Sequence, residues 1–211
     1  MGGEPPLGPL NAMTDQPDPP AEAPRRRTAE GRLPGDMTAE ALVERMIRVN
    51  QAGEYGAKRI YEGQLAVLKG KPKAAAEFAA VRHMYDQELK HLKEFERLIV
   101  ERRARPSLLY PVWHVAGFAL GAATAFLGPK AAMACTVAVE EVIDEHYRAQ
   151  TETLGSDERP LQQTIDKFRT EEQHHRDTGL AQGAEQAPAY PVLTAAIKAG
   201  SRLAIWLAER V

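Results

Sequence analysis

Apolar residues recur every three or four positions along most of the chain after Met37. This spacing keeps apolar side chains on one face of an α-helix, whereas a half-buried strand would alternate. Glycine and proline divide the pattern into long segments. The pattern predicts six helices, at about 38–69, 73–103, 107–127, 130–154, 158–182 and from 191 to the C-terminus. We therefore expect an all-α protein built as a helical bundle.

The first 37 residues differ from the rest of the chain. They are rich in proline and show no apolar period, so they cannot bury a core. We expect a disordered tail over 1–37, followed by one folded domain over 38–211. The tail lacks the apolar stretch of a secretory signal, and its acidic residues argue against an organelle transit peptide.

Composition narrows the function classes. The 211 residues are 44% apolar, enough to build a core, and carry a net charge of −2. A chain this close to neutral offers no polyelectrolyte surface, so we expect no nucleic-acid partner. The single cysteine, Cys135, lies in an apolar run and cannot form an intrachain disulfide. We interpret it as a small buried residue of a protein from a reducing compartment.

Two overlapping Glu-x-x-His pairs in the fifth predicted helix are the first candidate chemistry. Helical steps of three and four decide which pair faces the core. The apolar stripe that includes Phe168 continues to Glu172 and His175. Glu171 and His174 continue a polar stripe and should face water.

The same arrangement occurs earlier in the chain. In the second predicted helix, Glu88 and His91 interrupt an apolar stripe. Glu54 in the first helix and Glu140 in the fourth also stand among apolar positions, whereas Glu141 shares an outward face. The order is thus an inward glutamate followed by a Glu-x-x-His pair, and this order occurs twice.

Carboxylates that converge in a core need compensating charge. Burying one costs several kcal/mol unless it is paired, and four could not all stay ionised without cations. One Glu-x-x-His would usually be a surface pair, but two on apolar stripes fit two divalent cations bridged by carboxylates. Imidazole favours iron or manganese over magnesium or calcium, and ferritin-like bundles use this pattern. The predicted metal ligands are Glu54, Glu88, His91, Glu140, Glu172 and His175.

Other polar residues near these stripes are less informative. Tyr61 and Tyr147 lie on the ligand stripes, either as donors to the ligands or as core aromatics with solvated hydroxyls. His146 lies off the stripe of Glu140, so periodicity gives it no role. His83 and His114 have no carboxylate at ligand spacing, and we interpret them as ordinary.

The chain carries no formal charge between Arg105 and Lys130. Its helical part would be about 24 Å long, too short to span a hydrocarbon core of ~30 Å comfortably. Two interpretations stay open: a fully buried crossover helix, or a helix in a membrane interface with Tyr110 and Trp113 near the headgroups. The last helix is also apolar and includes Trp206. Together the two helices favour a peripheral membrane enzyme with a lipid substrate.

Five blocks of the sequence resemble a known family. They read RVNQAGEYGAKRIY, DQELKHLKEFE, GFALGAATAFLG, ACTVAVEEVIDEHYRAQTETL and APAYPVL. On these blocks the chain resembles the demethoxyubiquinone hydroxylases, over 38–211. The resemblance implies a ferritin-like four-helix bundle with an extra apolar crossover helix and a C-terminal helix. It also implies two carboxylate-bridged irons on the six residues above, and a role for His146 and Tyr147 in substrate or electron handling.

The resemblance further implies a reaction. A di-iron monooxygenase would use O2 and an electron donor to hydroxylate the ring of a polyprenylated demethoxyubiquinol in ubiquinone biosynthesis. We expect it peripherally at the cytoplasmic face of a bacterial inner membrane, with the matrix face of the mitochondrial inner membrane as the alternative. A lipid-binding accessory protein and a homo-oligomer are partners that the family allows.

Two other functions share parts of this pattern. A soluble ferritin-like iron oxidase would use the same ligands but would not need so apolar a segment at 107–127. A non-enzymatic quinone-binding scaffold would bind quinone without iron. A zinc protease is excluded, because neither histidine pair reads His-Glu-x-x-His.

Overall fold

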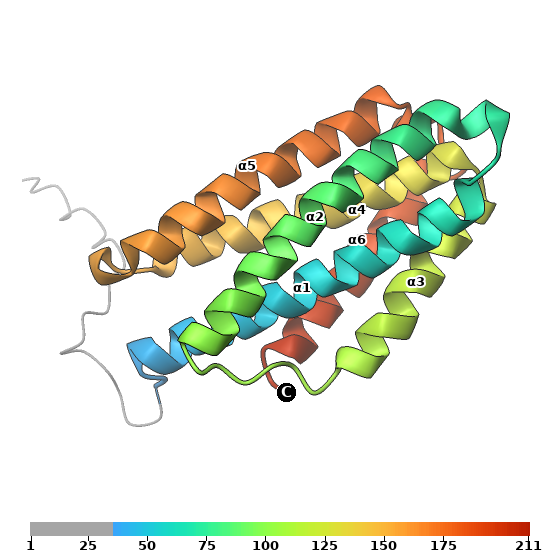
Figure 1. The fold of residues 1–211 in the computed structure, drawn as a ribbon. Coiled ribbons are helices and arrows are strands. Elements are labelled where there is room, and N and C mark those ends of the chain that lie inside the picture. Colours follow the sequence, from blue (N-terminus) through green and yellow to red (C-terminus); the bar gives the residue numbers. More distant parts are fainter. Residues whose placement is uncertain (1–35) are drawn as a thin grey trace, which may run out of the picture. The chain divides into compact units, whose positions relative to one another are not determined.

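Six α-helices dominate the computed structural model, which describes residues 36–211 (Figure 1). They are α1 (Ala39–Leu68), α2 (Ala75–Glu101), α3 (Tyr110–Phe126), α4 (Pro129–Thr153), α5 (Arg159–Ala181) and α6 (Tyr190–Ala208). Three short 3-10 helices stand in the connections, η2 (Pro72–Ala74), η3 (Ser156–Glu158) and η4 (Ala184–Gln186). No strand occurs in residues 36–211. The predicted all-α class is confirmed, and the helices end close to the predicted bounds. The predicted tail lies outside the described residues except for its last two, so it stays a prediction.

The residues that divide the sequence also begin and end the helices. The Thr38 side chain accepts a hydrogen bond from the backbone N–H of Ala41, 3.0 Å away, and so caps the start of α1. A proline occupies one of the first two positions of α3, α4, α5 and α6, where its missing N–H costs nothing. Gly70 after α1 and Gly183 after α5 adopt φ of 73° and 82°, which only glycine adopts without strain.

The four-helix core consists of α1 packed on α2 and α4 packed on α5 (Figure 1). Two apolar clusters fill it. Tyr61, Val81 and Met133 belong to one, and Ile47, Phe95 and Ile165 belong to the other. Along α1, α2 and α4 the predicted ligands fall between the residues of these two clusters, and on α5 they follow the residues of the second cluster. The bundle therefore has a polar layer with an apolar cluster on either side.

Helix α3 crosses from α2 to α4 and packs closely on α1. A Cβ on Gly121 would collide with the backbone of Ile60, so this contact requires glycine. The opposite face of α3 is open, because Val112, Val115 and Phe126 are exposed. A fully buried crossover helix is therefore the wrong interpretation. The sequence places apolar residues all round this helix, but α1 and α4 cover only one side.

Helix α6 packs on α4 and also leaves apolar side chains exposed, among them Val192, Leu203 and Trp206. Among the described helices, none combines the length and the apolar character needed to cross a membrane.

Candidate metal centre

The six predicted ligands come together in the polar layer of the four-helix core, and we call them the carboxylate layer. None of the six is more than 3% exposed. α1 and α4 each supply one glutamate, while α2 and α5 each supply a Glu-x-x-His pair: Glu54, Glu140, Glu88 with His91, and Glu172 with His175. The structure thus places all six where the stripes predicted; that they bind metal stays a prediction.

The carboxylate layer divides into two overlapping groups, each of which could hold one metal ion. The first is Glu54, Glu88, His91 and Glu172, and the second is Glu88, Glu140, Glu172 and His175. Within each group, one ligand atom from every residue lies within 4.8 Å of the others. Each group offers three carboxylates and one imidazole, and Glu88 and Glu172 belong to both. The set would therefore suit two adjacent ions, with Glu88 and Glu172 available to both.

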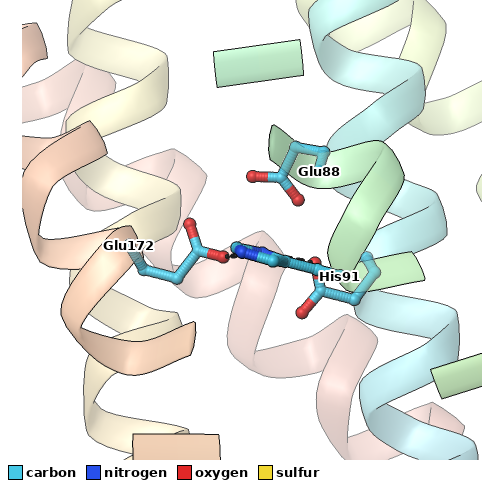
Figure 2. A group of neighbouring side chains, drawn as sticks. Glu88, His91 and Glu172 are labelled. Atoms are coloured by element: carbon cyan, nitrogen blue, oxygen red, sulfur yellow. Dashed lines mark hydrogen bonds and ion pairs between the residues drawn. The ribbon is translucent and has the colours of Figure 1, made fainter. Parts of the chain in front are cut away.

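Glu172 lies between the two imidazoles. Its Oε1 is 2.9 Å from Nδ1 of His91, and its Oε2 is 2.8 Å from Nδ1 of His175. Figure 2 shows Glu172 of α5 and His91 of α2 reaching towards one another, with Glu88 beside them. Glu88 Oε1 lies 3.2 Å from Nδ1 of His175. Both Nδ1 atoms therefore face into the layer.

Several polar atoms of the carboxylate layer have no hydrogen-bond partner in residues 36–211. They are Oε1 and Oε2 of Glu88, Oε2 of Glu172 and Nδ1 of His175. The short contacts between Nδ1 of His175 and the two carboxylates lack the geometry of a hydrogen bond. An unsatisfied buried polar group costs about 1–3 kcal/mol. Cations placed among these atoms would satisfy all four, so the residues fit a di-metal group.

Protons compensate the charge of the carboxylate layer when metal is absent. Burial and the charge of Glu172 raise the pKa of Glu88 and of Glu140 well above the usual value. Burial would lower the pKa of His91, but its contacts with Glu172 and Glu54 outweigh burial and raise that pKa to about 12. Divalent ions would replace these protons.

Two tyrosines donate hydrogen bonds to glutamates of the carboxylate layer. The hydroxyl of Tyr61 donates to Oε1 of Glu140, 2.8 Å away, and the hydroxyl of Tyr147 donates to Oε1 of Glu54. Each tyrosine stands seven residues after the glutamate of its own helix and bonds the glutamate of the other helix. Burial and the nearby carboxylates raise the pKa of both hydroxyls well above 10, so both remain donors. Neither hydroxyl is solvated; both contact predicted ligands.

His146 belongs to a polar network that periodicity did not indicate. Asn50 and Gln150 are buried and exchange two hydrogen bonds of 2.8 Å. Nε2 of His146 lies 2.7 Å from Nε2 of Gln150 and 3.2 Å from Oδ1 of Asn50. Burial lowers the pKa of His146 to about 4, so the ring is neutral at pH 7. Asn50 stands on the apolar stripe of α1, and a polar residue at such a position was the one feature of the sequence that could have indicated this network.

One expectation about the outward pair is wrong. His174 is exposed, as predicted, but Glu171 is half-buried, and its Oε2 lies 2.5 Å from Nε2 of His91. Gln87 makes the matching contact, with Oε1 at 3.1 Å from Nε2 of His175. Both residues flank a core stripe, and stepping along one helix does not reveal what a flanking side chain can reach on the facing helix.

An apolar cavity of about 330 Å³ lies between α1, α3, α4 and α6. Trp113 and Leu120 line it from α3, and Gly200 and Ile205 line it from α6. A smaller cavity of about 20 Å³ is lined by His146 and Tyr147 and by four residues of the carboxylate layer. The two cavities share five lining residues, Val49, Gly53, Ala57, Ile143 and Ile205. The apolar space therefore adjoins the carboxylate layer.

The known proteins that this chain matches agree with one another. The family model described as ubiquinone biosynthesis protein COQ7 matches residues 41–208. A 3-demethoxyubiquinol 3-hydroxylase from Rhodospirillum rubrum is 62% identical over 186 residues, which cover 88% of this chain and 86% of the relative. The human mitochondrial NADPH-dependent 3-demethoxyubiquinone 3-hydroxylase is 52% identical over 180 residues, 83% of this chain and 81% of the relative. The mitochondrial 5-demethoxyubiquinone hydroxylase of Saccharomyces cerevisiae is 42% identical over 186 residues, 81% and 79% of the two chains.

Proposed function

The chain belongs to the ubiquinone biosynthesis protein COQ7 family, and from this membership we propose that it is a membrane-associated di-iron monooxygenase. Its substrate would be a polyprenylated demethoxyubiquinol, which gains one hydroxyl group on the ring. The predicted family is confirmed, and with it the broader function of a hydroxylase in ubiquinone biosynthesis. The iron, the oxygen chemistry and the membrane are the parts that we propose.

The pair of overlapping ligand groups is the structural observation that carries the di-iron part of this proposal. Four buried carboxylates and two imidazoles, with Glu88 and Glu172 common to both groups, suit two ions of intermediate hardness such as iron. When bound, two irons would supply redox chemistry with O2 that no side chain of this chain can perform. Hydroxylation with O2 also yields water, so the reaction consumes two further electrons and an external donor is needed.

The chain's own residues hold the ligands and orient the ring. Tyr61 and Tyr147 donate to Glu140 and Glu54 and so fix the orientation of these two carboxylates. His146 and Tyr147 line the small cavity beside the carboxylate layer. We assign them the contact with the quinol ring, where neutral His146 can accept or donate a hydrogen bond.

The apolar cavity supports a lipid substrate. It is lined almost wholly by apolar side chains and adjoins the small cavity next to the ligands. A prenyl tail in this space would place its ring near the carboxylate layer. The exposed apolar residues of α3 and α6 would rest in the membrane interface and allow the tail to enter from lipid. We place the enzyme at the cytoplasmic face of a bacterial inner membrane, with the matrix face of the mitochondrial inner membrane as the alternative.

Oxygen-18 incorporation tests this function. The ferrous-loaded chain is mixed with a short-tailed demethoxyubiquinol and a reductant under labelled O2, and the product is weighed by mass spectrometry. One labelled oxygen in the product, and none with Glu172→Ala, supports the monooxygenase. Oxygen consumption with ferric iron and no labelled product would indicate an iron oxidase instead. Quinone binding without iron would indicate a scaffold.

A further inference from the structure

Each histidine of the carboxylate layer uses its two ring nitrogens differently. Nδ1 of His91 faces Glu172 and Glu54, at 2.9 and 3.5 Å, while Nε2 contacts Glu171 at 2.5 Å. His175 repeats this division: Nδ1 faces the layer, and Nε2 lies 3.1 Å from Oε1 of Gln87. The rings therefore point the same atom inward and the same atom outward.

The two outward contacts are reciprocal between α2 and α5. Gln87 immediately precedes Glu88 on α2 and reaches His175 on α5. Glu171 immediately precedes Glu172 on α5 and reaches His91 on α2. Each helix thus carries a Glu-x-x-His pair and, one residue earlier, the group that holds the histidine of the other helix.

The outward contacts leave Nδ1 of each ring available to a metal ion. A carboxylate oxygen and an amide oxygen are both acceptors, so Nε2 of each ring keeps its hydrogen. A metal ion among the carboxylates would take the place of any hydrogen on Nδ1, which faces the carboxylate layer, and would bind the lone pair of that nitrogen. A histidine that binds metal through one nitrogen commonly donates from the other to such an oxygen, which orients the ring and raises its basicity.

The two acceptors differ in charge. Glu171 is a carboxylate with a side chain 28% exposed, whereas Gln87 is neutral. A charged acceptor polarises an imidazole more strongly than a neutral one. The ring of His91 should therefore be the stronger donor to metal, although partial exposure of Glu171 moderates the difference.

We propose that Glu171 and Gln87 are positioning residues for the two histidines, and that their difference in charge makes the two metal positions unequal, with the position beside His91 the tighter. This inference rests on the proposed di-metal function. It concerns residues outside the six ligands, and it predicts an order in which the positions fill.

Anaerobic titration with ferrous iron-57, followed by Mössbauer spectroscopy, tests the inference. The wild-type chain should show one quadrupole doublet at one equivalent and a second doublet at two equivalents. Glu171→Gln should weaken the first position by about 10–100-fold and remove the order of filling. The exchanged variant Gln87→Glu with Glu171→Gln should reverse the order of the two doublets.

Glu141→Gln is the matched control. Glu141 is 35% exposed, follows the predicted ligand Glu140 and pairs with Lys198, so its loss should leave both doublets and their order unchanged. The melting temperature of each metal-free variant reports folding. If Glu171→Gln does not fold, the single variant Gln87→Glu tests the inference. It should increase the iron affinity of the position beside His175 and so reduce the difference in affinity between the two positions.

Three results would overturn the inference. Wild-type chains that fill both positions together would remove the inequality. Variants that bind two irons with wild-type order and affinity would show that neither residue positions its histidine, while the proposed function would stand. A folded wild-type chain that binds no iron would remove both the inference and the proposed function.

Discussion

The hydroxyl of Tyr61 on α1 donates a hydrogen bond to Oε1 of Glu140 on α4, 2.8 Å away. Tyr147 on α4 makes the corresponding bond to Glu54 on α1. The two helices that supply one ligand each thus support one another's ligand, as α2 and α5 do through Gln87 and Glu171. The carboxylate layer is consequently fixed by contacts that cross between helices.

Replacing Tyr61 by phenylalanine should destabilise the metal-free chain by about 1–3 kcal/mol, because Oε1 of Glu140 loses its donor in a buried site. Urea unfolding measures the change. Tyr85→Phe is the control: its hydroxyl contacts half-buried Glu62 at 3.2 Å, and its loss should cost less than about 1 kcal/mol. Equal stability of Tyr61→Phe and wild type would contradict the role given to this bond.

The stability of the metal-free chain should fall as pH rises above 6.5. His91 has its pKa raised from 6.5 to about 12 in the folded state, so its contribution is complete below pH 6.5 and is lost as pH rises towards 12. Glu88 and Glu140, with pKa raised above 4.5, act in the same direction. Glu172 has its pKa lowered to about 2, so its contribution to stability is lost only as pH falls from 4.5 towards 2.

Bound metal should reverse the pH dependence of stability, so that the loaded chain becomes more stable as pH rises. Metal ions replace the bound protons, so metal affinity increases with pH over the same window. Urea unfolding of chelator-treated and iron-loaded chains at pH 6.5 and at about pH 9 measures both trends. Metal-free and loaded chains that respond alike to pH would contradict the compensation of charge by protons.

Filling the apolar cavity should impair use of a long-tailed quinol. Gly200 lines the cavity, and apart from its chain neighbours and the nearby backbone of α6, no atom of the described residues lies within 4 Å of where its Cβ would stand. Gly200→Leu should therefore fold and bind iron normally, while kcat/KM for the long-tailed substrate falls by about tenfold or more. Ala199→Leu, at a neighbouring exposed position that does not line the cavity, should retain wild-type kinetics. Unchanged kinetics in both variants would place the tail elsewhere.

Charge on the open face of α3 or α6 should abolish binding to vesicles. Val115 on α3 and Val192 on α6 are 67% and 72% exposed, and glutamate at either would have to be desolvated in a membrane interface. Co-sedimentation with liposomes measures the loss. Val100 on α2 is 78% exposed, so Val100→Glu is the matched control. Equal sedimentation of all three variants would contradict this membrane surface.

Helical periodicity was sufficient to place the carboxylate layer. Glu172 and Phe168 share a stripe, so a buried Phe168 indicates a buried Glu172, and the structure has both inside. Helical periodicity could not predict the contacts between helices. Glu171 reaches His91, which stands 80 positions earlier in the chain, and the spacing within α5 carries no information about α2.

Periodicity also could not predict which face of α3 is buried. The helix is apolar on nearly every side, so its sequence does not tell a buried face from an exposed one. Gly121 marks the buried face only after its close approach to Ile60 is known. Exposure of Val115 follows from the packing of α1 and α4, which cover a single side of α3.

Anomalous diffraction at the iron edge, from crystals grown with ferrous iron under anaerobic conditions, tests the central claim most directly. We predict two iron peaks in each chain, one beside Nδ1 of His91 and one beside Nδ1 of His175, with the carboxylate of Glu172 between them. A single peak, or iron bound only outside the carboxylate layer, would contradict the di-iron centre.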